Sequence, residues 1–438
     1  MSRSVFALTL TCTCIILFSS LIGTFKVAAA TPSFFHPATK FYFSKYDMLN
    51  AQWDAIHIVN VGTETATIGI LCMSSYWPHN AHQAAISDDF TLGGGQQTYR
   101  TYPGIACGGG GSGPLTVSSN QPILVTQRIL GWTAMQEIYG IPGDMASTDI
   151  LFTWYDSVNA VDDIHVFIPD DLMQPTEVDL YVAGDLKGHL GPSDLGPGMT
   201  PHESVISFAN LIGGPLRIVS DLPIFASQRV TGFGDFAEIL GLPAWYTFTE
   251  TWFNWYDMQN AWDAIHMVNP SGTTTANVQV YVAGTLQTSL FIPPGAEEYR
   301  ILPGLIGGPV RVVSDQPILV TQRIVGWDGW KEVFGLQASL GLYQISSYYY
   351  MTWYDMQGAS WDAIHFINPA SATNAQVKIY IGGVLKQTLT VGAGKATYVT
   401  YPSLMGGPVR IVSTVPVMSS QRILGWDSFE ETLAVSVS

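Results

Sequence analysis

The chain has 438 residues and a formal net charge of −16 at pH 7, and only 12% of its residues are Asp, Glu, Lys or Arg. This charged share is about half of that in an average soluble protein. Because so acidic a chain repels a phosphate backbone, the composition argues against nucleic acid as a partner. Abundant Gly, Tyr and Trp with few charges favour an exposed exported protein over a cytosolic enzyme.

Residues 1–30 predict a secretory signal segment. Arg3 precedes an almost uncharged apolar run from Val5 to Phe25, and three alanines end the segment at Ala30. Small residues after an apolar core are typical of a signal-peptide cleavage site. We therefore expect a secreted or cell-surface, extracellular protein. The apolar run approaches the length that spans a bilayer, so an uncleaved leader is the alternative and would be the only membrane contact.

Four imperfect copies of one module fill the rest of the chain. Each copy contains a Tyr-Asp pair, an Asp-x-x-His sequence and a closing Gln-Arg pair. We place the copies at residues 39–140, 148–241, 249–335 and 347–434. A tandem array of this kind defines an architecture but not an activity.

The third copy is the cleanest template for the fold. Residues 276–283 alternate apolar and polar side chains, and residues 286–292 and 318–325 are further strands of this type. Ser314 to Pro317 predict a turn between strands, and Gly326 to Gly335 fit one helical turn. The sequence thus predicts an all-β fold of four tandem antiparallel β-sandwich modules of the immunoglobulin-like kind, after the signal segment.

The connectors between copies are rich in aromatic residues. They run from Ile141 to Ile150, from Leu242 to Thr251 and from Leu336 to Tyr350. Such connectors are expected to dock on the sandwiches, which predicts a semi-rigid rod or a compact arc of modules.

Two cysteines lie outside the leader, Cys72 and Cys107, both in the first copy. In an oxidising compartment they predict a disulfide. Two unpaired buried thiols are the alternative.

Charged residues recur in every copy and invite a metal or acid/base interpretation. Residues three apart on a strand point to opposite faces, however, so the Asp and His of each Asp-x-x-His do not converge. We interpret the histidines as buried structural residues, and we expect Arg323 and its counterparts to pair with the Tyr-Asp aspartate or with a recurring glutamate such as Glu332. No catalytic residue, metal or cofactor is predicted. This structural polar set comprises Asp47, Asp54, His57, Arg128, Asp156, Asp162, His165, Arg229, Asp257, Asp263, His266, Arg323, Asp355, Asp362, His365 and Arg422.

Features that do not recur are the better candidates for binding. An insertion in the first copy holds a candidate ligand loop with Trp77, His79, His82, Asp88 and Asp89. It would bind a sugar through an exposed aromatic ring, or a metal; an ordinary surface loop is the alternative. Tryptophans also precede three of the four Asp-x-x-His aspartates, as sugar platforms or as packed residues: Trp53, Trp262 and Trp361.

Two sequence stretches characterise the repeat, Trp-Asp-Ala-Ile-His-x-x-Asn-Pro and Gly-Gly-Pro-Val-Arg-Val-Val-Ser-Asp-Gln-Pro-Ile-Leu-Val-Thr-Gln-Arg. They resemble a module of uncharacterised secreted and cell-surface proteins of bacteria, which is sometimes carried beside cell-wall enzymes. The resemblance covers residues of about 40 to 434. It implies an immunoglobulin-like sandwich used for display or attachment, with no catalytic residues to carry over. The second copy departs most, with Val161, Asp163 and Ile168 where the others have Trp, Ala and Asn.

Three functional hypotheses follow. The first is an exported non-enzymatic repeat protein of the cell envelope with a structural, adhesive or spacer role. The second is a carbohydrate- or cell-wall-binding protein that uses aromatic loops. The third is an accessory or divergent form of a cell-wall hydrolase. The expected partners are cell-wall or extracellular polysaccharides or other surface proteins, and uncovered sandwich edges would also permit self-assembly.

Overall fold

The four repeats form four similar all-β modules. The computed structural model describes residues 34–73, 84–108, 114–131, 134–169, 176–195, 203–327, 329–337, 345–370 and 372–437. The predicted class, four tandem antiparallel β-sandwich modules, is confirmed. No helix among the described residues is long and apolar enough to cross a membrane.

Each module repeats the same order of strands. Module 1 consists of β1 (Ala38–Phe43), β2 (Lys45–Asp47), β3 (Trp53–Asn60), β4 (Ala66–Met73), β5 (Ala84–Leu92), β6 (Gln97–Arg100), β7 (Ala106–Gly108), β8 (Leu115–Gly131), β9 (Ala134–Tyr139) and β10 (Ile141–Pro142), and is followed by the short helix η1 (Gly143–Met145). Module 2 consists of β11 (Ser147–Phe152), β12 (Tyr155–Asp156), β13 (Val161–Phe167), β14 (Val178–Val182), β15 (Asp185–Leu190), α2 (Pro192–Leu195), β16 (Glu203–Ile206), β17 (Ile212–Gly213), β18 (Leu216–Gly232), β19 (Asp235–Leu240) and β20 (Leu242–Pro243).

The third and fourth modules follow the same plan. Module 3 consists of β21 (Phe248–Phe253), β22 (Tyr256–Asp257), β23 (Trp262–Val268), β24 (Ala276–Val282), β25 (Thr285–Ile292), β26 (Glu297–Ile301), β27 (Ile306–Gly307), β28 (Val310–Gly326), β29 (Gly329–Phe334) and β30 (Leu336–Gln337). Module 4 consists of β31 (Ser346–Met351), β32 (Tyr354–Asp355), β33 (Trp361–Ile367), β34 (Ala375–Ile381), β35 (Val384–Val391), β36 (Ala396–Val399), β37 (Met405–Gly406), β38 (Val409–Gly425), β39 (Ser428–Leu433) and β40 (Val435–Ser436).

One strand of 17 residues, β28 in module 3, belongs to both sheets of its sandwich. Its first half pairs with β24 and β21, and its second half pairs with β23 and β29. The register shifts where Phe248 pairs with Ile318 but Glu250 pairs with Val313. This bulge redirects the strand from one sheet to the other. The predicted turn at Ser314 to Pro317 is therefore wrong, because the chain bends there without leaving its strand.

The core of module 3 lies between these two sheets. Alternate residues of β24, namely Val278, Val280 and Val282, pack against Ile265 and Met267 of β23 in one apolar cluster. The intervening residues of β24 are exposed or half-buried, as the period-two pattern of the sequence predicts for a strand with one buried face.

A strand replaces the helical turn that the sequence predicts at Gly326 to Gly335. Gly326 pairs with Gly329, so β28 and β29 form a hairpin. The equivalent strands of the other three modules form the same hairpin. The prediction was wrong because β29 is buried on both faces, with Trp330 at 1%, Lys331 at 2% and Val333 at 3% exposure, so it lacks an alternating pattern.

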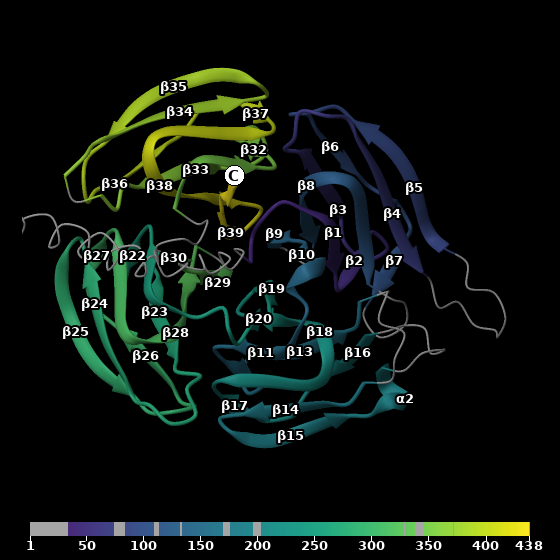
Figure 1. Cartoon of the computed structure of the whole chain (residues 1–438), viewed down its shortest axis with the longest axis vertical. Coiled ribbons are helices and arrows are strands. Elements are labelled where there is room, and N and C mark those ends of the chain that lie inside the picture. Colours follow the sequence, from purple (N-terminus) through teal and green to yellow (C-terminus); the bar gives the residue numbers. More distant parts are fainter. Residues whose placement is uncertain are drawn as a thin grey trace, which may run out of the picture. The chain divides into compact units, whose positions relative to one another are not determined.

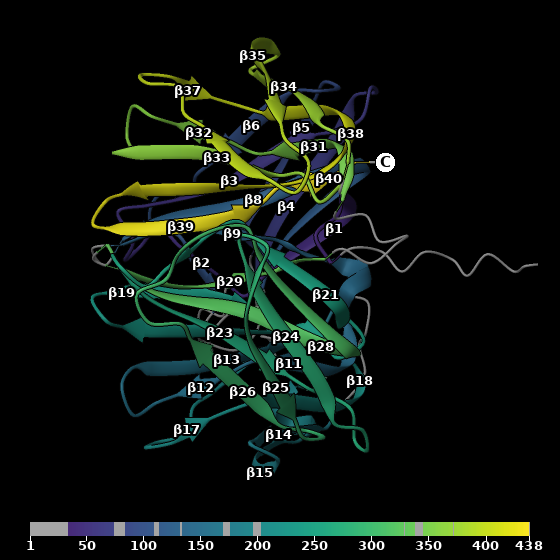
Figure 2. The ribbon, with the colours of Figure 1, turned by 90° about the vertical axis from the view of Figure 1, so that its left-hand side faces the viewer.

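The four hairpin strands close the modules into a ring. Strands β9, β19, β29 and β39 contact one another in cyclic order, so that module 4 returns to module 1. Figure 1 shows them where the four modules meet, and Figure 2 shows module 4 in front of module 1 and module 3 in front of module 2.

An apolar cluster distinct from the four sandwich cores joins the modules. It includes Tyr42 of module 1, Phe225 of module 2, Leu319 of module 3 and Met418 of module 4. The rings of Tyr42 and Phe225 lie 4.8 Å apart. The described parts of the four modules thus share an inter-module core. The predicted rod or compact arc of modules is therefore wrong, because the fourth module contacts the first and the array closes.

Candidate functional site: the junctions between modules

A buried glutamate stands at the centre of each junction. It lies on the hairpin strand of one module, and its side chain is at most 4% exposed. The four are Glu137, Glu238, Glu332 and Glu431. Because a buried carboxylate needs several hydrogen-bond donors, each one recruits partners from two modules.

The junction from module 2 to module 3 shows the pattern. Glu332 Oε2 accepts from Nε of Arg323 at 3.1 Å, and Glu332 Oε1 accepts from the Thr321 hydroxyl at 2.8 Å. Nη2 of Arg323 also donates to Oε2. The Thr153 hydroxyl, from module 2, donates to Oε1 and lies 3.0 Å from the Thr321 hydroxyl. One carboxylate therefore ties a strand pair of its own module to the residue that directly follows the first strand of the preceding module.

The other three junctions repeat this arrangement. The side chain from the preceding module is Ser44 on Glu238, Asn254 on Glu431 and Thr352 on Glu137. The own-module arginines are Arg229, Arg422 and Arg128. Since Thr352 belongs to module 4 and Glu137 to module 1, the last junction closes the ring with a 2.7 Å hydrogen bond.

These carboxylates remain charged. Burial alone would raise the pKa of Glu238, but Arg229, His165 and the two hydroxyl donors lower it to about 2. The pKa values of Glu137, Glu332 and Glu431 are lowered for the same combination of reasons. The carboxylate and its arginine are therefore an ion pair throughout the neutral range.

The recurring histidines lie on the strand face that meets the preceding module. His266 is 3% exposed, its Nδ1 lies 2.8 Å from Glu297, and its ring stacks on Tyr299 with centroids 5.3 Å apart. Trp154 of module 2 packs edge-on against the same imidazole, at 5.7 Å. Burial and Arg128 lower the pKa of His57 to about 3, and burial and Arg422 lower the pKa of His365 to about 4. Both are neutral at pH 7.

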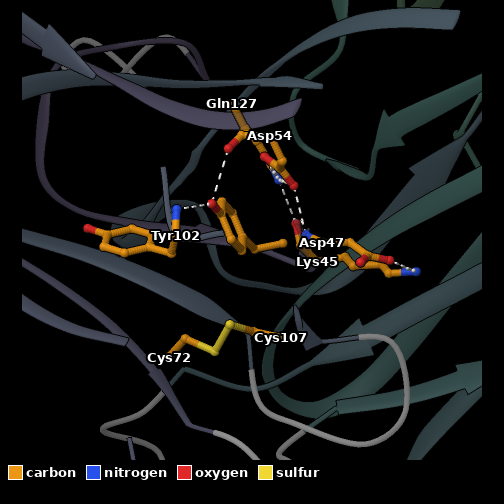
Figure 3. The surroundings of a disulfide bond; sticks show 8 residues. Lys45, Asp47, Asp54, Cys72, Tyr102, Cys107 and Gln127 are labelled. Carbon is orange, nitrogen blue, oxygen red and sulfur yellow. Dashed lines mark hydrogen bonds and ion pairs between the residues drawn. A yellow bond between two sulfur atoms is a disulfide. The ribbon is translucent and has the colours of Figure 1, made fainter. Parts of the chain in front are cut away.

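The aspartates of the Asp-x-x-His sequences point the other way, into their own modules. Both oxygens of Asp54 lie 2.9 Å from Gln127 Nε2, and Oδ2 accepts from the backbone N–H of Asp47 at 2.8 Å (Figure 3). Burial raises the pKa of Asp54 to about 7. Asp162, Asp263 and Asp362 accept from the equivalent glutamines of their own modules. Burial likewise raises the pKa of each of these aspartates to about 7.

The aspartates of the Tyr-Asp pairs stabilise turns. Asp47 Oδ1 accepts from the backbone N–H groups of Leu49 and Asn50, at 3.1 and 2.9 Å. Asp156, Asp257 and Asp355 make the equivalent bonds. Asp355 also approaches Arg128 of module 1, with 4.0 Å between Oδ2 and Nη1. Of the two predicted arginine partners, the glutamate is therefore the one found in every module. Among the described residues, a Tyr-Asp aspartate pairs with one of these arginines only at the junction of modules 4 and 1.

The predicted disulfide is confirmed. Cys72 of β4 and Cys107 of β7 are bonded, with their Cα atoms 6.2 Å apart (Figure 3). A loop of 35 residues closed in this way stabilises the folded state by about 4 kcal/mol on the chain-entropy account.

The candidate ligand loop of module 1 is only partly described. Trp77, His79 and His82 lie outside the described residues. Asp88 and Asp89 are not in a loop, which corrects the prediction: they belong to β5, which pairs with β4. Asp88 accepts from Tyr102 at 2.9 Å and pairs with Arg100 at 3.2 Å. Asp88 and Phe90 share the half-buried face of β5, whereas Asp89 between them is exposed, as the period of two on a strand requires.

A pocket of about 370 Å³ opens at the junction of modules 2 and 3. Its lining includes Trp154 and Phe233 of module 2 and Trp262, Tyr299 and Arg323 of module 3. Sequence reasoning singled out Trp262 and Arg323 but missed Trp154. The available signal was the Trp-Tyr-Asp sequence in modules 2 to 4, which module 1 replaces with Lys45-Tyr46-Asp47.

A second polar cluster lies where the hairpin strands meet. Lys331 of module 3 lies 3.1 Å from Asp235 of module 2, which also accepts from the Ser428 hydroxyl of module 4 at 2.7 Å. Burial raises the pKa of Glu430 there to about 8. A cavity of about 40 Å³ beside this cluster is lined by Lys331, Glu430 and Phe35. Three modules thus share one buried set of polar side chains.

No cluster of three or more metal-ligating side chains occurs among the described residues. In comparisons with known proteins, no protein-family model matches the chain and no curated protein has a similar sequence.

Proposed function

We propose that this chain is an exported, non-enzymatic protein of the cell envelope with a structural or adhesive role. The observation that carries the proposal is the use of the recurring charged residues. Glu332 and its three counterparts already bind an arginine and two further side chains, one from the neighbouring module. Groups engaged in this way hold a scaffold together and are not free to act on a substrate.

Two further observations support the proposal, one for the exterior location and one for attachment. The disulfide between Cys72 and Cys107 is of the kind that persists in oxidising compartments. The ring also presents exposed apolar side chains on its edge strands, among them Phe291 at 71% exposure on β25 and Val384 at 57% on β35. Edge strands of this kind fit an element that attaches to, or assembles with, other surface components.

Retention on cell-wall material tests the proposal. Residues 31–438 are incubated with insoluble polysaccharides and purified wall fractions, and both the bound protein and the released sugar or peptide are measured. We expect saturable retention without release. Release in proportion to added protein, and lost in His82→Ala, would contradict the proposal and favour the hydrolase hypothesis. Failure to be retained on any matrix would contradict the adhesive role.

The carbohydrate-binding hypothesis is the second candidate, and the aromatic pocket between modules 2 and 3 is the observation that favours it. The first-module loop offers a competing location, so Trp77→Ala serves as a comparison in the same retention assay. Loss of retention in that variant alone would locate binding in the loop.

A further inference from the structure

We propose that the pocket between modules 2 and 3 binds one sugar ring of a neutral polysaccharide. This inference deepens the adhesive role proposed above and rests on it for its biological setting. The pocket volume of about 370 Å³ lies at the lower end of the range of roughly 300 to 1,000 Å³ for small-molecule sites.

The walls of the pocket are aromatic and open to solvent. Trp262 is 37% exposed, Tyr299 is 43% exposed, and Phe233, from the preceding module, is 50% exposed. Trp154 supports the wall, because its ring packs edge-on against Tyr299 with centroids 6.2 Å apart. The C–H groups of a pyranose ring pack against such faces, while exposed aromatic area of this kind is otherwise disfavoured.

Two polar groups in the lining of the pocket, Arg323 and Asp156, fit hydroxyl groups. Arg323 uses Nε and Nη2 for Glu332, and its side chain keeps 13% exposure. At the junction of modules 4 and 1, the equivalent Arg128 pairs with Asp355. Among the described residues, no ion pair joins Arg323 to the corresponding Asp156, although both line the pocket. A sugar hydroxyl between them would accept from the guanidinium and donate to the carboxylate.

Two differences between junctions explain why this one is open. Trp53 and Trp361 pack edge-on against the histidines of their own modules, with ring centroids 5.8 and 5.9 Å apart. Trp262 makes no ring contact of this kind within the described part of the chain. In addition, Phe233 stands where modules 3 and 4 have Trp327 and Trp426. Trp327 packs on Phe429 of module 4 at 5.3 Å, and Phe233 packs in the equivalent place on Trp330 of module 3 at 6.1 Å.

The remaining junction, between modules 1 and 2, lacks the aromatic walls. Lys45, Val161 and Val205 stand at the positions of Trp154, Trp262 and Tyr299. These departures in the first and second copies therefore remove the aromatic walls from one junction, and at the next the smaller Phe233 stands where modules 3 and 4 have a tryptophan. A neutral sugar is favoured over an anionic one because the chain carries a net charge of −16.

Titration with soluble oligosaccharides tests the site. Calorimetry and tryptophan fluorescence follow the binding of cellohexaose, chitohexaose, mannohexaose and xylohexaose to residues 31–438, with polygalacturonate oligomers as the anionic comparison. We expect one neutral oligosaccharide to bind at one site per chain. Trp262→Ala should weaken binding at least tenfold, whereas Trp361→Ala, the same change at the junction of modules 3 and 4, should leave it unchanged.

Phe233→Trp is the second variant, because it fills the pocket without removing a wall. The substitution suits the backbone, since Phe233 has a φ of 54° and Trp327 has a φ of 50°. It should abolish binding while leaving the near-ultraviolet circular dichroism and the unfolding midpoint close to those of the parent chain. Binding that survives in Phe233→Trp, or that is weakened equally by Trp262→Ala and Trp361→Ala, would overturn the inference. So would preference for the anionic oligomers.

The outcome separates this inference from the proposed function. Retention on wall fractions that persists in Trp262→Ala would overturn the pocket and keep the adhesive role. Oligosaccharide binding without retention on any wall material would keep the pocket and overturn the adhesive role. Absence of both would overturn both.

Discussion

Glu332→Gln removes the charge at one junction without changing its shape. The side chain of Glu332 is 2% exposed, and that of its partner Arg323 is 13% exposed. In the variant, an amide nitrogen or an uncharged oxygen would face the guanidinium, so Arg323 would stay buried without a counter-charge. Breaking a buried pair in this way costs roughly 3 to 5 kcal/mol. Because Arg323 keeps some exposure, we expect a loss of about 3 kcal/mol.

Reversible urea unfolding, followed by tryptophan fluorescence, measures this loss. Glu298→Gln is the matched control, because Glu298 pairs with Arg300 in the same module but both side chains are at least 35% exposed. The control should change the free energy of unfolding by less than about 1 kcal/mol. If Glu332→Gln cost no more than Glu298→Gln, the junction carboxylates would not hold the modules together, and the reasoning would be refuted.

Three other variants test separate parts of the structure. Asp263 has a pKa raised to about 7 from 3.8, so its contribution to stability is complete below pH 4 and is lost as pH rises through 7. The free energy of unfolding of Asp263→Asn, relative to that of the parent chain, should therefore rise by up to about 4 kcal/mol between pH 4 and pH 9. A difference in free energy between the two chains that is independent of pH would contradict this. Phe35→Ala should lower the free energy of unfolding in urea by about 3 kcal/mol, because Phe35 is 5% exposed and its ring lies 5.0 Å from that of Tyr139. A loss below about 1 kcal/mol would show that Phe35 does not pack in the inter-module cluster. Cys72→Ser should lower stability by about 4 kcal/mol, and reduction of the parent chain should reproduce the loss; no effect of either would exclude a stabilising disulfide.

The strands with one exposed face could be predicted from the sequence. Residues 276–283 alternate because one side of β24 packs in the core of module 3 and the other faces solvent. The inward orientation of Gln322 also follows from alternation, and its amide binds Asp263 at 2.8 Å and the Trp255 carbonyl oxygen at 2.9 Å.

Closure of the ring could not be predicted in this way. The bond between Thr153 and Glu332 joins residues 179 apart in sequence, and that between Thr352 and Glu137 joins residues 215 apart. Nothing local distinguishes Thr153 from a surface threonine. The hairpin strands that meet at the centre, such as β29, are buried on both faces and so lose the alternation by which strands are recognised. The recurrence of Glu332 in every copy was the one visible sign.

The central claim is that module 4 closes on module 1, and a cysteine pair across that junction tests it most directly. The hydroxyl oxygens of Thr126 and Thr352 lie 2.9 Å apart. Residues 31–438 carrying Thr126→Cys and Thr352→Cys are oxidised, and the product is analysed by non-reducing electrophoresis and peptide mass spectrometry, with each single variant as control. We predict an intramolecular disulfide that links modules 1 and 4 in the double variant alone. A folded double variant whose two thiols remained free under oxidation would contradict the closed ring.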